Sequence, residues 1–134
     1  MLTKQHDSLY FLNEWRLPYP VYRFCTGDVD GDGSEDALVG VVKSTRFHPE
    51  KARRIFIFKQ VDGHVRPLWL GSRLGANLVD FRFMESSRCI RALETDGMGK
   101  YAVVDYAWGD FGPTFKRTII KNTDYKNVIK QFNQ

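Results

Sequence analysis

The segment Asp28-Val-Asp-Gly-Asp-Gly-Ser-Glu-Asp36 carries four aspartates at alternate or near-alternate positions, with glycines between them. In one tight loop, these carboxylates would repel one another. A hard divalent cation removes that conflict, because calcium accepts several oxygen ligands at flexible geometry. The spacing therefore predicts a calcium site. Its expected ligands are the side chains of Asp28, Asp30, Asp32 and Asp36 and the backbone carbonyl of Ser34.

The residues on either side of the loop decide what kind of calcium loop it is. An EF-hand needs a glutamate at the twelfth position and a helix on each side. The twelfth residue counted from Asp28 is Val39. The flanking segments 21–25 and 37–42 are rich in β-branched and aromatic residues, which favours strands. The sequence therefore predicts a calcium loop that joins two strands, with a plain Asp- and Gly-rich turn as the alternative.

Residues 25–40, Cys-Thr-Gly-Asp-Val-Asp-Gly-Asp-Gly-Ser-Glu-Asp-Ala-Leu-Val-Gly, resemble the FG-GAP repeat of integrin α-subunit propellers and their bacterial relatives. The pattern of that family is a strand, then Asp-x-Asp-x-Asp-Gly-x-x-Asp, then an apolar strand. In the family the four aspartates bind calcium in a β-hairpin connection. The resemblance implies the same role for Asp28, Asp30, Asp32 and Asp36. We expect a structural ion, because no bistable element is visible in the sequence.

The composition suits one globular domain with its own core. The chain has 134 residues, 43% hydrophobic and 14% aromatic. No apolar run approaches the roughly 18 residues of a membrane span, and no signal peptide precedes Thr3–Ser8. If a leader has been trimmed, we expect an extracytoplasmic protein (periplasmic, surface-bound or secreted), because free calcium is high there. Otherwise we expect it in the cytoplasm. Cys25 and Cys89 are expected to be buried free thiols.

The net charge of +4 conceals an uneven distribution. The loop holds five of the 16 acidic residues, so the remainder has 20 basic against 11 acidic residues, an excess of +9. Such a surface could attract nucleic acid. The sequence shows no recognition helix or stacking platform, so we expect a solvated face and no nucleic-acid binding. Basic residues gather in the segment from Lys43 to Arg66, namely Lys43, Arg46, Lys51, Arg53, Arg54, Lys59 and Arg66.

The rest of the chain alternates short apolar segments with turn residues, which predicts an all-β fold. Asp62-Gly63 is typical of a two-residue hairpin turn, and Pro67 indicates an edge strand or a bulge. Residues 9–15 are apolar but of uncertain type. Strands are expected at 21–25, 37–43, 53–59, 65–70, 78–84, 89–93, 101–108 and 115–120, a loop at 70–75 and a short helix at 125–132.

A second loop resembles the first. Asp96-Gly-Met-Gly99 aligns with Asp30-Gly-Asp-Gly33, but it lacks carboxylates at the positions of Asp32 and Asp36. This favours a single domain, 1–134, of two blade-like repeats at about 17–70 and 75–122. Two repeats cannot close a propeller. We therefore expect two antiparallel blade-like sheets packed together, with a small β-barrel or a coincidence of Gly-rich turns as alternatives.

The sequence shows no convincing active site. His6, His48 and His64 are scattered, and none lies in a metal-binding motif. Asp105 and Asp110 are more typical of solvent-facing acids than of a catalytic pair.

We therefore expect a non-enzymatic, calcium-stabilised β-domain that binds an unidentified protein or glycan at the cell envelope or outside the cell. Trp15, Trp69 and Trp108 are candidate anchors, although each is more typical of a core residue. The alternative is an enzyme or enzyme-associated domain with a groove between its sheets.

Overall fold

The computed structural model describes residues 1–44, 51–71 and 77–134. Most of the expected loop at 70–75, together with Arg46 and His48, lies outside the described residues. The chain forms two compact units. One contains Met1–Gly27 and Ser34–Ser72, and the other contains Asp28–Gly33 and Arg73–Gln134.

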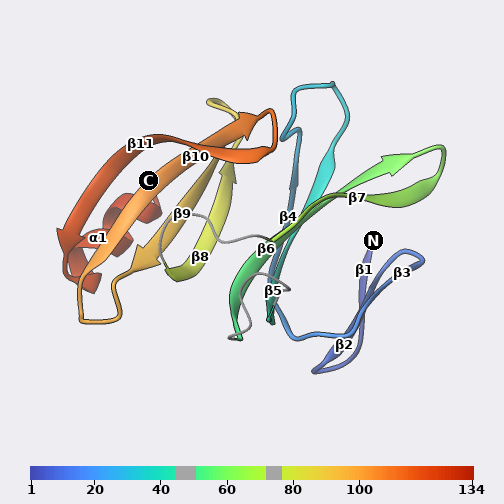
Figure 1. Ribbon diagram of the computed structural model, residues 1–134, viewed down its shortest axis with the longest axis horizontal. Helices are drawn as coiled ribbons and strands as arrows, with labels where there is room; N and C mark the ends of the chain where they lie inside the picture. The colour runs from blue at the N-terminus through green and yellow to red at the C-terminus, as the bar shows by residue number, and fades with distance from the viewer. Residues whose placement is uncertain (45–50, 72–76) are drawn as a thin grey trace. The chain divides into compact units, whose positions relative to one another are not determined.

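All sheets of the described chain are antiparallel (Figure 1). In the first unit, a small sheet has the order β1-β2-β3, formed by Leu2–His6, Leu9–Leu12 and Trp15–Leu17. The larger sheet of that unit has the order β4-β5-β6-β7, formed by Val21–Gly27, Asp36–Lys43, Ala52–Val61 and His64–Leu70. The second unit has one sheet of order β11-β10-β9-β8 and a helix. Its strands β8 to β11 are Asn77–Met84, Cys89–Thr95, Tyr101–Gly109 and Gly112–Thr123, and α1 is Tyr125–Phe132.

These elements confirm the prediction of an all-β chain with a short C-terminal helix, and the helix has the predicted bounds. Every predicted strand is present, and each is somewhat longer than expected. The described residues form no closed barrel, so the barrel alternative is wrong. The interpretation as two blade-like repeats of one domain, with their sheets packed together, stays a prediction.

Strand β5 forms the centre of the first unit, because apolar side chains lie on both of its faces. Leu38, Val39 and Val41 have no exposed surface, as its continuous apolar run predicts. On one face the small sheet contributes to the core, so β1–β3 cover part of the larger sheet. The buried members of that cluster are Leu12, Leu17, Val39, Val41, Phe56, Phe58 and Val65.

The small sheet is the part of the fold that the sequence did not predict. Strand β1 is polar and largely exposed, so it shows no apolar alternation. The apolar segment 9–15 is divided between β2 and β3. Asn13 lies in the turn between them with φ 51°, a left-handed conformation that asparagine tolerates.

The β6–β7 hairpin confirms two local predictions. Asp62 and Gly63 both have positive φ, 52° and 79°, as a two-residue type I′ turn requires. Pro67 lies in the edge strand β7, where its missing N–H costs no ladder bond. The register also shifts between Ile57 and Phe58, opposite this part of β7, so an edge position and a bulge occur together.

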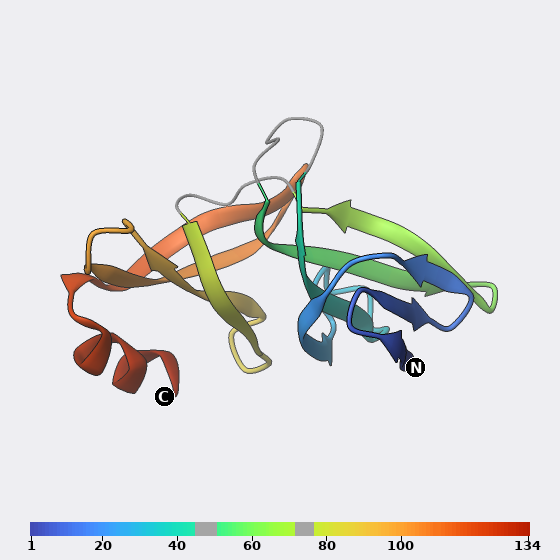
Figure 2. The same cartoon turned by 90° about the horizontal axis from the view of Figure 1, so that it is seen from below.

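Helix α1 covers one face of the second sheet (Figure 2). Its Val128 and Phe132 are buried in a cluster with Leu93 of β9 and Val103 of β10. Asp124 caps the helix, because its carboxylate accepts a backbone hydrogen bond of 2.9 Å from the first turn. The helix therefore closes the apolar surface that this sheet would otherwise expose.

We expect Phe132→Ala to lower the free energy of unfolding by about 3–5 kcal/mol, because it removes a buried ring from this cluster. Denaturant titration followed by circular dichroism measures the change. The control is Lys130→Ala, an exposed position of the same helix, which should change stability by less than about 0.5 kcal/mol. Equal effects of the two substitutions would show that the helix does not cover the sheet.

Candidate metal site

Asp28 organises the loop between β4 and β5. Its Oδ1 accepts hydrogen bonds from the backbone N–H groups of Gly31 at 2.9 Å and Asp32 at 3.1 Å. Its Oδ2 accepts a third, from Gly33, at 2.9 Å. Gly31 and Gly33 have φ values of 79° and 91°, which glycine adopts without steric cost. The three hydrogen bonds to the Asp28 carboxylate thus hold this part of the chain in a tight turn, which fits the turn expected from the sequence.

The structure brings together three of the four predicted carboxylate ligands. One oxygen from each of Asp28, Asp30 and Asp36 lies within 4.8 Å of the others, so the group could hold a metal ion. The side chain of Asp32 lies outside this group. Its backbone N–H instead bonds Oδ1 of Asp28 and, at 3.4 Å, Oδ1 of Asp30. The carbonyl of Ser34 stays a predicted ligand, and so does calcium as the identity of the ion.

Asp36 also has a cationic partner that the sequence did not reveal. The ammonium of Lys59 lies 2.8 Å from Oδ1 of Asp36. The Asp36 side chain is fully buried and that of Lys59 is 16% exposed, so the pair is well shielded from water. Ala37 pairs with Phe58, which places Lys59 across from Asp36. The strand register, which the sequence did not specify, was needed to find this contact.

The second loop shares the glycine conformations of the first but not its acidic group. Gly97 and Gly99 have φ values of 78° and 86°, and Oδ1 of Asp96 accepts N–H bonds from Met98 at 2.7 Å and Lys100 at 3.1 Å. The connection from β9 to β10 is shorter than that from β4 to β5. Apart from the Asp28 group, the described residues contain no cluster of three or more metal-ligating side chains.

Glu94 precedes the second loop, two residues before Asp96, as Asp28 precedes Asp30 in the first. It is buried, and its Oε2 accepts a hydrogen bond of 2.6 Å from the hydroxyl of Tyr106. Burial raises the pKa of Glu94, although the Tyr106 hydroxyl opposes the shift. It contributes to a cavity of about 210 Å³, which is lined by Glu94, Thr95, Asp96, Lys100, Tyr101, Ala102 and Asn122.

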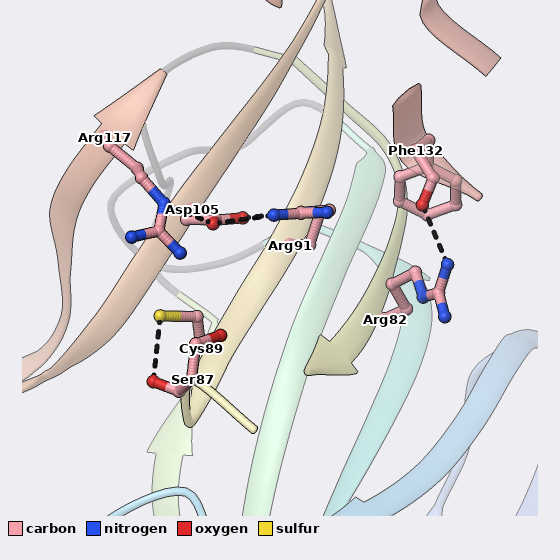
Figure 3. Close-up of polar contacts among 7 residues, drawn as sticks. All are labelled: Arg82, Ser87, Cys89, Arg91, Asp105, Arg117 and Phe132. Carbon is pink, nitrogen blue, oxygen red and sulfur yellow. Dashed lines mark hydrogen bonds and ion pairs between the residues drawn. The ribbon is translucent and has the colours of Figure 1, made fainter. Parts of the chain in front are cut away.

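Asp105 corrects one expectation from the sequence, because it has no exposed surface. Its two oxygens accept hydrogen bonds from Nε and Nη2 of Arg91 at 2.8 and 3.0 Å, and Oδ2 also accepts one from Nε of Arg117 at 3.0 Å (Figure 3). Burial raises the pKa of Asp105, but the two guanidinium groups outweigh it and hold the pKa below its ordinary value. Asp110 is exposed, as expected.

Trp15, Trp69 and Trp108 are half-buried, and the ring of Trp15 lies 5.5 Å from that of the core residue Phe58. The expectation of a solvated basic face is wrong for Arg54, which is buried and donates from Nε to the carbonyl of Lys43 at 2.8 Å.

In the described residues neither cysteine forms a disulfide. Cys89 is fully buried, whereas Cys25 is only half-buried, so the prediction of burial is confirmed for Cys89 alone.

Comparison of the chain with models of protein families, with curated proteins and with solved structures gave no match. In the described residues, no helix has the length and apolar character needed to cross a bilayer.

The buried Glu94 generates a prediction about pH. The pKa of Glu94 is raised in the folded protein. Neutral Glu94 therefore contributes its full stability when the pH is below about 4.3, the pKa of a glutamate in the unfolded chain. This stability is lost as the pH rises through the folded pKa. Glu94→Gln keeps a neutral acceptor for Tyr106, so its stability relative to the parent should increase between pH 4 and pH 8. Denaturant titrations across this range measure the difference.

The matched control is Glu85→Gln, at an exposed position of the same unit. Its stability relative to the parent should change little across the same pH range. A Glu94→Gln difference that stays constant with pH would contradict the assignment of a raised pKa.

Proposed function

We propose that this chain is a non-enzymatic β-domain stabilised by calcium, acting as a binding module. The observation that supports the proposal is the approach of the Asp28, Asp30 and Asp36 oxygens to within 4.8 Å. Lys59 offsets one of the three negative charges. A divalent cation would supply the positive charge that such a group of carboxylates attracts, and calcium suits oxygen ligands at flexible distances.

The proposed ion has a structural role. Asp28 and Asp30 belong to the loop, whereas Asp36 begins strand β5, so one ion would bind both ends of the same β4–β5 connection. The unfolded chain does not preform this arrangement, so binding would add directly to the stability of the fold.

We propose a protein or glycan as the partner and the cell envelope or the extracellular space as the location, because calcium is plentiful there. We also propose that residues 25–40 are related to FG-GAP repeats. The enzyme alternative has one supporting observation, the raised pKa of Glu94 beside a cavity. We favour the binding module because the Tyr106 hydroxyl already engages the Glu94 carboxyl group.

Calcium should raise the melting temperature of the parent protein. At a hundred times its dissociation constant, the ion stabilises the fold by about 2.7 kcal/mol, which corresponds to roughly 5–13 °C. Magnesium should do much less, because it holds its water and demands stricter geometry. Asp30→Ala should abolish most of the calcium effect, and Asp96→Ala in the second loop should preserve it. Thermal melts with chelator, calcium or magnesium measure these shifts. One melting temperature in all three conditions would reject the calcium assignment.

Lys59→Met distinguishes the effect of the Lys59 ammonium on Asp36 from the effect of a bound metal ion. Without metal, the variant should lose about 3–5 kcal/mol, because Asp36 keeps a buried charge without the ammonium. Calcium should then stabilise the variant more than the parent, since the ion no longer shares Asp36 with a cation. If the variant is destabilised and calcium restores nothing, Lys59 is the counter-ion of Asp36 and the loop is a plain turn.

A further inference from the structure

One row of charged side chains crosses the whole sheet of the second unit. Arg82 of β8 pairs with Arg91 of β9, Arg91 pairs with Asp105 of β10, and Asp105 pairs with Arg117 of β11. Residues directly opposite each other on antiparallel strands point to the same face, so these four side chains are neighbours there. None of the metal-site residues belongs to this row.

Asp105 fixes the geometry of the row from its centre. It is fully buried and engages Arg91 through two nitrogens and Arg117 through one, so it lies between two guanidinium groups (Figure 3). A planar guanidinium group that is held by a carboxylate along one edge presents its other N–H groups in a fixed direction. The carboxylate thus orients both arginines before any ligand arrives.

The row has more positive charge than its own carboxylate can neutralise. Three guanidinium groups face one acid, and Arg82 lies directly opposite Arg91, an arrangement in which like charges repel. Nη1 of Arg82 donates to the carbonyl of Phe132 at the end of α1, at 3.0 Å, which uses one donor but leaves the charge. Within the described part of the chain, Asp105 is the one acid that pairs with these arginines.

Several donors of the row are unused. The described residues offer no hydrogen-bond partner to Nη1 of Arg91 or to either terminal nitrogen of Arg117. Nη1 of Arg91 is not completely buried, because every fully buried polar side-chain atom of the non-exposed described residues has a partner. The Arg117 side chain is 45% exposed and that of Arg91 is 11% exposed. The row therefore combines an accessible guanidinium group with a nearly buried one.

We propose that this arginine row (Arg82, Arg91, Asp105 and Arg117) binds a tetrahedral oxyanion, the phosphate or sulfate group of a ligand. The excess of two positive charges matches a phosphate monoester, which approaches two negative charges near neutral pH, better than a sulfate ester, which carries one. Arg91 and Arg117 supply the N–H groups that would bind its oxygens, because guanidinium groups donate to such oxygens in pairs. Arg82 adds charge from the neighbouring strand. This site is independent of the proposed calcium loop and needs no metal.

The test titrates the full chain in calcium-free buffer with inorganic phosphate, with sulfate and, at matched ionic strength, with chloride. Binding is followed by calorimetry and by the Nε–H resonances of arginine in NMR spectra. Phosphate or sulfate should bind saturably and shift the signals of Arg91 and Arg117, whereas chloride should not. Tighter binding of phosphate than of sulfate would favour a phosphate ester as the ligand. Identical responses to all three anions would overturn the proposal.

Variants distinguish binding by the arginine row from a nonspecific effect of the protein's net charge. Arg117→Gln should weaken binding of the preferred anion by about tenfold or more, because it removes a charged pair of donors. Arg117→Lys keeps the charge but not the fork, so its binding should also be weaker than that of the parent. Lys116→Gln is the matched control, because it removes one charge from an exposed position of the same strand and should change affinity by less than about twofold. Equal losses from Arg117→Gln and Lys116→Gln would reject the site. Circular dichroism spectra recorded below each variant's melting temperature would show that the variants remain folded.

Discussion

The pairing register of strand β5 is the constraint on which the first unit depends. It places Val39 between Phe24 of β4 and Phe56 of β6 and sets Asp36 across from Lys59. A slip of one residue would turn every side chain of β5 to the opposite face. The buried apolar residues therefore do more than form a core. They also hold Asp36 at the end of the acidic loop, beside the ammonium of Lys59 and within the carboxylate group that could hold a metal ion.

Burial acts in opposite ways on the two acids of the second unit because their partners differ. Glu94 meets a neutral hydroxyl, and desolvation raises its pKa. Asp105 meets two guanidinium groups, and their attraction exceeds the cost of desolvation. In this sheet the protonated form of one carboxyl group, Glu94, is therefore favoured, whereas the ionised form of the other, Asp105, is favoured. The first makes stability depend on pH, and the second organises the arginine row.

The local pattern of the sequence predicted most of the fold, because strands, turns and the helix depend on nearby residues. Asp62-Gly63 and the helix at 125–132 needed no long-range information. The carboxylate group was predicted in part, since spacing along the chain brought Asp28, Asp30 and Asp36 together but did not reveal that Asp32 lies outside. Contacts across strands could not be predicted. Lys59 and the arginine row depend on registers that join segments far apart in the sequence.

The edge strand β7 has a consequence for assembly. An open edge offers unpaired N–H and C=O groups to the edge of another molecule, which promotes polymerisation. Pro67 removes one of these donors, and the irregular register beside it breaks the regular spacing of the rest. This edge is therefore a poor template for pairing with a second copy of the chain.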